Sequence, residues 1–286
     1  MTGRVLRLTR FELRKLAARR LPVLALALVV AIALLAPSVG RAVDTASSLM
    51  SGKGAQAADS WKNGWTAMAS AVSTARLFVF IVVVVLAGSA VAEEASHGTL
   101  KTLFVRPVRR VELLLAKALA TWGWGALLLV VAVLAAMLGA ELNLGLYDVA
   151  DPTFGITKHT FGTMLGYTAL ATVVTLAPLA ALTGLGLLAS CLSDHPGHAT
   201  GGAIGALFFL SGLAGVATHP GVRDAMFVTY SAMPFEVVDA LANQFAGERE
   251  RLALPGVVQA VVVSLAWAVA GFGGATWLLG RRDIGG

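Results

Sequence analysis

Six long apolar segments, separated by short polar ones, dominate the hydrophobic pattern of the sequence. A helix that crosses a membrane needs about 20 mostly apolar residues, and each segment reaches or approaches that length. We therefore predict an all-α membrane protein with six transmembrane helices, at about residues 21–40, 68–92, 110–140, 161–192, 199–218 and 254–280. The fourth segment is longer than one hydrocarbon core is wide, so we expect a kink at Pro178 or a protruding end.

Composition supports this interpretation and charge gives an orientation. The 286-residue chain is 57% hydrophobic and only 13% charged, with a mean hydropathy of +0.78, whereas a soluble domain carries about 25% charged residues. Fourteen of the 22 Lys and Arg residues fall at the two termini and in the loop at 93–117. The positive-inside rule therefore predicts cytoplasmic termini, for a chain in the inner or plasma membrane of the cell. The one cysteine, Cys191, excludes an internal disulfide.

Residues 1–20 are predicted to form a unit of their own ahead of the six-span domain at 21–286. On a helical wheel the apolar and basic side chains take opposite faces: Leu6, Leu13 and Leu16 against Arg7, Arg10 and Arg14. This pattern is typical of an amphipathic helix that lies in the membrane interface, with arginines at anionic headgroups. Such a helix serves as an anchor, either alone or with a contact to a cytoplasmic partner.

A charged stretch, EEASHGTLKTLFVRPVRRVELLLAKALA, joins the second and third spans at 93–120. Glu93 and Glu94 end the second span, Gly98 breaks the helix, and Thr99 is able to cap a new one. Pro107 ends that new helix or opens the third span. The sequence therefore predicts a short cytoplasmic helix between the two spans.

This short helix, at 99–105, has an apolar face formed at spacings of three and four residues by Leu100, Leu103 and Phe104. Residues at those spacings are neighbours on a helix surface. An exposed apolar face below a membrane domain is typical of a docking device. The alternative is a solvated loop on the membrane surface.

Other segments predict structure more than chemistry. In the outer segment 219–251, Pro234 suits a first helical turn, and apolar residues follow at helical spacing. We expect a short amphipathic helix there, either on the outer side or dipping back into the membrane. Trp65 is expected at the membrane surface as an interface anchor. Arg76 is the charged candidate inside a span; it is either functional or reaches out to the outer surface.

The sequence does not indicate an enzyme. A phosphate-binding loop requires G-x-x-x-x-G-K-[ST], and the nearest stretch, SGKGA at 51–55, has no Ser or Thr after its lysine. The segment CLSDHPGH at 191–198 has residue types that bind transition metals. Because it connects two spans so tightly, we interpret it as a turn with Asp194 as a helix cap and predict no metal.

The charged stretch resembles a motif in the transmembrane subunits of ABC transporters of the type-2 permease family. In this chain the motif comprises Glu94, Gly98-Thr99-Leu100, Pro107, Arg109-Arg110 and Glu112-Leu113-Leu114-Leu115-Ala116-Lys117. Weaker matches are Phe11-Glu12-Leu13, Leu187-Leu188-Ala189-Ser190, Pro234 and Arg281-Arg282-Asp283-Ile284. His97 departs from the pattern, because such proteins often carry a basic residue there.

The resemblance implies a permease subunit that pairs with a second permease, with a homodimer expected, and docks on two ABC ATP-binding subunits. Those subunits would bind ATP and Mg, so no cofactor is expected in this chain, and no nucleic acid is expected as a partner. The implied coupling residues are Glu93, Glu94, Gly98, Thr99, Leu100, Leu103, Phe104 and Pro107. Secondary contacts are expected at Glu12, Asp194 and His195. Export is the usual direction, while a membrane scaffold, an assembly factor or a channel is the alternative; the substrate stays open.

Overall fold

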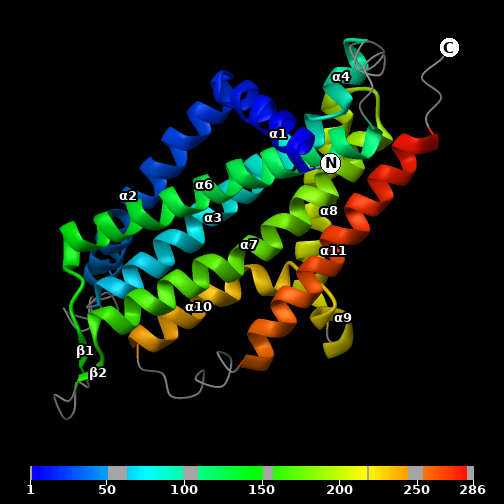
Figure 1. Ribbon diagram of the computed structural model, residues 1–286. Helices are drawn as coiled ribbons and strands as arrows, with labels where there is room; N and C mark the ends of the chain where they lie inside the picture. The colour runs from blue at the N-terminus through cyan, green and yellow to red at the C-terminus, as the bar shows by residue number, and fades with distance from the viewer. Residues whose placement is uncertain are drawn as a thin grey trace.

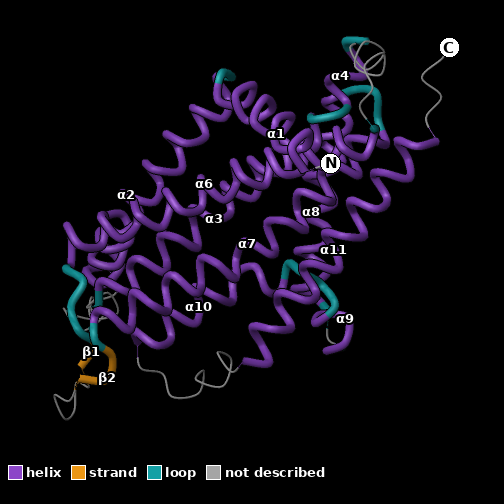
Figure 2. Tube along the Cα trace, in the orientation of Figure 1, coloured by secondary structure: helices purple, strands orange, loops and turns teal. Residues whose placement is uncertain are grey.

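The computed structural model describes residues 2–50, 63–98, 109–150, 157–217, 219–243 and 254–281. Within them the fold is almost entirely helical (Figure 2). The helices are α1 (Thr2–Ala17), α2 (Arg20–Met50), α3 (Gly64–Ser89), α4 (Ala92–Ser96), α6 (Arg110–Leu144), α7 (Phe161–Leu192), α8 (Pro196–Val216), α9 (Pro220–Asp224), α10 (Thr229–Asn243) and α11 (Leu254–Arg281). A two-stranded antiparallel hairpin, β1 (Val149–Ala150) with β2 (Thr157–His159), joins α6 to α7.

Six of these helices are long and apolar enough to cross a membrane: α2, α3, α6, α7, α8 and α11. The prediction of an all-α membrane protein with six spans is therefore confirmed. The start of α1, the end of α11 and α4 lie toward one end of the bundle, and the β1–β2 hairpin lies at the other (Figure 1). With an even number of spans, the two ends of the chain must lie on the same side of the membrane, as they do here.

The core lies where α3, α6 and α7 run side by side (Figure 1). Helix α3 is buried over most of its circumference, as expected of a helix that is apolar all round. Helix α11 packs closely on α7, because a Cβ placed on Gly271 would lie only 2.6 Å from the carbonyl carbon of Gly184. Small residues permit such close approaches between helix backbones in membranes.

Helix α10 corrects the expected position of Pro234 and bears on whether the outer amphipathic helix dips back into the membrane. It begins at Thr229, so Pro234 lies inside the helix and not in its first turn. Asn63 Nδ2 donates to the carbonyl of Ala242 at 3.2 Å, and Arg76 Nη1 donates to Ser231 Oγ at 2.8 Å. These contacts pair the start of α3 with the end of α10, and the middle of α3 with the start of α10. Helix α10 therefore runs antiparallel to α3, along the first half of that spanning helix. This favours a helix that dips back into the membrane.

Two further expectations were wrong. Trp65 is fully buried, and its Nε1 donates to the carbonyl of Tyr147 at 2.9 Å, so it does not anchor the chain at the lipid surface. The N-cap position of α8 is His195 and not Asp194, because Pro196 takes the first helical position, where proline fits well; the His195 side chain makes no capping hydrogen bond. The long fourth span, α7, is one 32-residue helix with Pro178 inside it.

Candidate functional site

The predicted docking loop is framed by two stems. Its residues 99–108, with Thr99, Leu100, Leu103, Phe104 and Pro107, lie outside the described residues. The first stem is α4, which ends before Gly98, and the φ of 68° at Gly98 stops the helix as expected. The second stem begins at Arg109, whose backbone N–H donates to the Glu112 carboxylate at 3.4 Å as α6 starts.

A buried ion pair connects the two stems. Lys117 Nζ lies 2.6 Å from Glu94 Oε1, and the two side chains are only 2% and 9% exposed. Lys15 of α1 also donates to Glu94 Oε1, at 3.0 Å. Attraction between opposite charges is strong where water is excluded, so the distance between α4 and α6 is held at the base of the loop.

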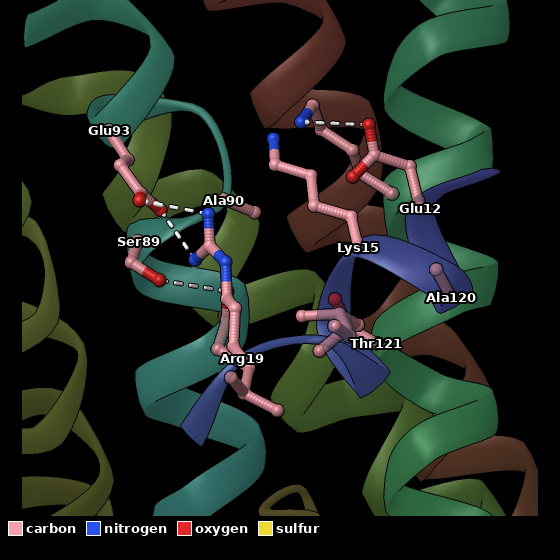
Figure 3. Close-up of a pocket in the computed structure, with 11 residues that line it drawn as sticks. Glu12, Lys15, Arg19, Ser89, Ala90, Glu93, Ala120 and Thr121 are labelled. Atoms are coloured by element: carbon pink, nitrogen blue, oxygen red, sulfur yellow. Dashed lines mark hydrogen bonds and ion pairs between the residues drawn. The ribbon is translucent and has the colours of Figure 1, made fainter. Parts of the chain in front are cut away.

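Helix α1 and the short turn that follows it contribute three residues to the same place. Besides Lys15, its Glu12 accepts from Lys117 at 3.4 Å. Arg19, just after α1, makes two parallel hydrogen bonds of 2.7 and 2.8 Å to the Glu93 carboxylate (Figure 3). We call the six side chains together the charge cluster: Glu12, Lys15, Arg19, Glu93, Glu94 and Lys117.

Every member of the charge cluster except Glu94 lines a pocket of about 20 Å³ between α1, α3 and α6 (Figure 3). Its remaining wall is formed by Leu16, Leu86, Ser89, Ala90, Ala120 and Thr121. This volume holds a water molecule but no organic ligand. The cluster is therefore suited to holding helices together, and not to binding a transported molecule.

At the break between α3 and α4, the free backbone N–H groups find their hydrogen-bond acceptor on another span. Val91 and Ala92 have backbone N–H groups that donate to Ser190 Oγ, at 2.9 and 3.0 Å. Ser190 lies near the end of α7 and is fully buried. A helix start normally finds its cap in the preceding residue, so here α7 supplies the cap and holds the first stem in place.

The second stem is joined to the last span as well. Arg110 Nη1 donates to the carbonyl groups of Leu279 and Gly280, at 2.8 and 3.1 Å. Those carbonyls belong to the last turn of α11, where helical acceptors lack partners. The stems thus contact α1, α7 and α11 in addition to each other.

The structure brings together Glu12, Glu93 and Glu94 but places the other predicted contacts elsewhere. Asp194 and His195 lie in the turn between α7 and α8, just before α8, which contacts α4. In the part of the chain that the structure describes, no group of three His, Cys, Asp or Glu side chains is placed so that it could hold a metal ion. The absence of a metal and the contacts of these residues with a partner remain predictions.

Sequence reasoning missed Lys15, Arg19 and Ser190, and it treated Lys117 only as part of a motif. A signal for the first two exists, because Glu12, Lys15 and Arg19 recur at spacings that place them on one side of a helix. Lys117 also stands alone within a long apolar run. A lone cation in a span requires a partner, and the sequence does not say which.

Arg76 forms a second polar site, at the depth where α10 begins. Its side chain is buried, its Nη1 bonds Ser231, and its guanidinium lies 5.2 Å from the ring centre of Phe80. Among the described residues, its Nε has no hydrogen-bond partner. The side chain therefore points into the bundle and does not reach out to the surface; a functional role for Arg76 stays a prediction.

Comparison with known proteins agrees with this architecture. No curated protein matches the sequence significantly. A family profile described as "ABC-2 family transporter protein" matches residues 8–189, well over half of the chain. This match covers most of α1, the charged stretch, the first three spans and most of α7, and so includes every residue of the charge cluster. The chain therefore belongs to the ABC-2 family of transporter proteins and is a membrane component, a permease, of an ABC transporter.

Proposed function

We propose that this chain is the permease subunit on which a separate ATP-binding subunit acts to drive export. The observation that carries the proposal is the buried pair of Lys117 and Glu94, which joins the two stems of the cytoplasmic loop. Burying an ion pair costs free energy, and a solvated loop gains nothing from having its ends fixed in this way. A loop that receives a mechanical load does require fixed ends.

The contacts of the stems suggest how such a load spreads. A push on the 99–108 loop reaches α3 through α4, α7 through Ser190, and α11 through Arg110. It reaches α1 through Lys15, which bonds Glu94. Packed helices transmit displacement because protein interiors are dense. The inner ends of the spans would therefore move together when the ATP-binding subunits close on ATP.

A second copy of the chain is the proposed partner within the membrane. Helix α8 buries Ala199, Ala203 and Leu207 against its own chain. On its opposite face, Gly201 and Gly205 have no atom within 4 Å of a Cβ placed on them. Small residues four apart favour close helix pairing in membranes, so this face supports a homodimer.

The test uses the full permease expressed with its cognate ATP-binding subunit. Changing Leu103→Ala together with Phe104→Ala should leave insertion and thermal stability near normal. Each well-buried interface anchor is worth ~2 kcal/mol, so association should weaken at least ~30-fold, or hydrolysis should lose its link to transport. The matched control is Leu134→Ala with Leu138→Ala, two exposed residues of α6, which should change neither.

Two results would contradict the proposal. One is steady ATP hydrolysis by the isolated permease. The other is a wild-type permease that binds no ATP-binding subunit, which would instead support a scaffold or a channel. If the double variant unfolds the permease, the 99–108 stretch belongs to the membrane core and is not a docking helix.

A further inference from the structure

A groove with apolar walls runs between α6 and α11, and α7 forms its floor. In Figure 1, α7 lies between the other two helices. Helix α11 packs mainly on α7 and touches α6 little, so a space of about 380 Å³ is left between α6 and α11. We call this space the α6–α11 groove. Its walls include Leu115, Leu119 and Trp122 of α6, Ala180 and Gly184 of α7, and Phe272 of α11.

The walls of the α6–α11 groove suit a hydrocarbon. Among the described residues that line it, none is charged. The polar atoms in the walls are already bonded to the backbone of α7: the Thr183 hydroxyl donates to the carbonyl of Leu179 at 2.9 Å, and Trp122 Nε1 donates to the carbonyl of Leu176 at 3.0 Å. An apolar cavity of ~150 Å³ holds benzene, which has six carbon atoms, so this groove has room for an alkyl chain of about a dozen carbons.

The α6–α11 groove is about as deep as one leaflet of a bilayer. Trp122, at its deep end, lies twelve positions after Arg110 in α6, or about 18 Å along the helix. On the opposite wall, Ala268 lies thirteen positions before Arg281 in α11, or about 20 Å. Half of a hydrocarbon core is ~15 Å thick. A chain in the groove would therefore begin at headgroup level, at the loop end of the bundle, and end near the middle of the bilayer.

Positive charge gathers at the shallow end of the α6–α11 groove. Arg109 and Arg110 stand at the start of α6, and Arg281 ends α11. Arg110 also bonds the last turn of α11, so the two helices meet there. The Arg281 guanidinium lies 4.0 Å from the ring centre of the exposed Trp277, a residue type that is enriched at headgroup level. Guanidinium groups bond phosphate oxygens in pairs, so this end suits an anionic head.

We propose that the α6–α11 groove holds one acyl chain of a phospholipid whose anionic headgroup lies at these arginines. The walls fit the chain, the depth fits one leaflet, and the charges fit a phosphate without a compensating cation. The chain fills the space in which α6 and α11 do not pack on each other. Because the second stem of the 99–108 loop begins at the start of α6, the lipid would hold that stem at a fixed distance from the last span.

The first experiment places the full chain, without an ATP-binding subunit, in nanodiscs of phosphatidylcholine. A small amount of phosphatidylglycerol carries a photoreactive diazirine at the far end of one acyl chain, and mass spectrometry of the digested protein locates the label. The label should concentrate near Trp122 and Ala268. Unlabelled phosphatidylglycerol should compete for these sites far more readily than for Phe208 and Phe209, exposed residues of α8 outside the groove. Equal labelling of all exposed apolar residues, without competition, would indicate surrounding bilayer lipid only and would overturn the proposal.

A filled groove provides the second test. Ala118→Phe with Ala180→Leu adds bulk from two walls and should abolish the competed labelling near Trp122. The matched control makes the same two changes at Ala266 and Ala270, which are exposed on α11 outside the groove, and should be labelled like wild type. Gel filtration and thermal unfolding confirm that both variants are folded. Competed labelling that persists in a folded, filled variant would contradict the site.

A third test concerns the headgroup and does not require the groove to be filled. Arg109→Gln with Arg281→Gln removes two exposed charges. Each basic residue near an anionic lipid contributes about fivefold in affinity, so the preference for phosphatidylglycerol over phosphatidylcholine should fall roughly 25-fold. The control, Arg4→Gln with Arg7→Gln, removes two exposed charges of α1 at the same end of the bundle and should keep the preference. An equal fall in both variants would show a response to total charge and would contradict the position of the headgroup.

Two other occupants of the α6–α11 groove would give different results. A second copy of the chain would replace lipid labelling with cross-links between two copies of α11. A transported amphiphile would leave the groove during turnover, so labelling that disappears when ATP is added to the complex with the ATP-binding subunit would contradict a resident lipid. Only this last comparison rests on the proposed function. A complex that never forms contradicts the proposed function alone, because labelling of the isolated permease stands by itself.

Discussion

Lys117 Nζ lies 2.6 Å from Glu94 Oε1, between the two stems of the 99–108 loop, in a place that water hardly reaches. The pair is not an efficient way to gain stability, since a buried ion pair is often no better than apolar side chains of the same size. It is, however, an efficient way to fix a register, because a slip between α4 and α6 separates the two most buried charges of the cluster and leaves each with only its longer contact to α1. The contact therefore supports a positional role.

Removing one member of the pair should be more harmful than removing both. Lys117→Ala is expected to lower the free energy of unfolding by ~3 kcal/mol, because Glu12 loses its partner and Glu94 keeps only Lys15 for its buried charge. Lys117→Met combined with Glu94→Leu should recover most of that loss. Thermal unfolding in detergent provides the double-mutant cycle. Arg19→Ala is the contrast, because its half-exposed pair with Glu93 is worth only ~0.2–1 kcal/mol; equal losses at both sites would contradict a buried register contact.

Ser190→Ala should destabilise the break between α3 and α4. The change leaves the N–H groups of Val91 and Ala92 without the acceptor they now share, and a buried unsatisfied donor costs ~1–3 kcal/mol. Ser89→Ala is the control, since its hydroxyl bonds only the carbonyl of Leu86 in its own helix and should matter little. Similar unfolding temperatures for the two variants would show that the cap from α7 is dispensable.

Arg76→Met should separate stability from function. Methionine fills a similar volume without a charge, so the free energy of unfolding should stay within about 1 kcal/mol of the wild type or exceed it. Transport should nevertheless fall, because a charged group kept inside a span is a functional candidate. Arg76→Ala, which also removes the packing of the long side chain, should be less stable than Arg76→Met. Full transport by the methionine variant would reduce Arg76 to a structural contact with Ser231.

Single cysteines test the orientation that the charge distribution predicts. In a background without Cys191, a cysteine at Lys158 in β2 should react with an impermeant thiol reagent added to intact cells. A cysteine at Gly3 in α1 should react only after lysis. The reverse pattern would invert the topology and place the charge cluster on the outer side. Labelling of both in intact cells would show that an even number of spans separates the two positions, and not the three predicted.

The spans were predictable because each depends only on its own run of apolar residues. The charge cluster was not, since Lys15 and Glu94 are 79 positions apart and a sequence does not state which distant segments meet. Trp65 shows the same limit: a tryptophan at the start of a span usually faces the interface, but here the residues after α6 cover it. Pro234 was placed by a local preference that the packing of α10 on α3 and α7 overrides.

The cap that Ser190 supplies also bears on how the protein is made. Its hydroxyl accepts from Ala92, a residue 98 positions earlier in the chain, so the ribosome completes the fourth span long after it has released the first stem of the loop. Until that span is inserted, α4 lacks its cap and the loop lacks a fixed base. An ATP-binding subunit would then find a finished docking surface only on a permease whose first four spans are already in the membrane. The order of synthesis would in this way set the order in which the transporter assembles.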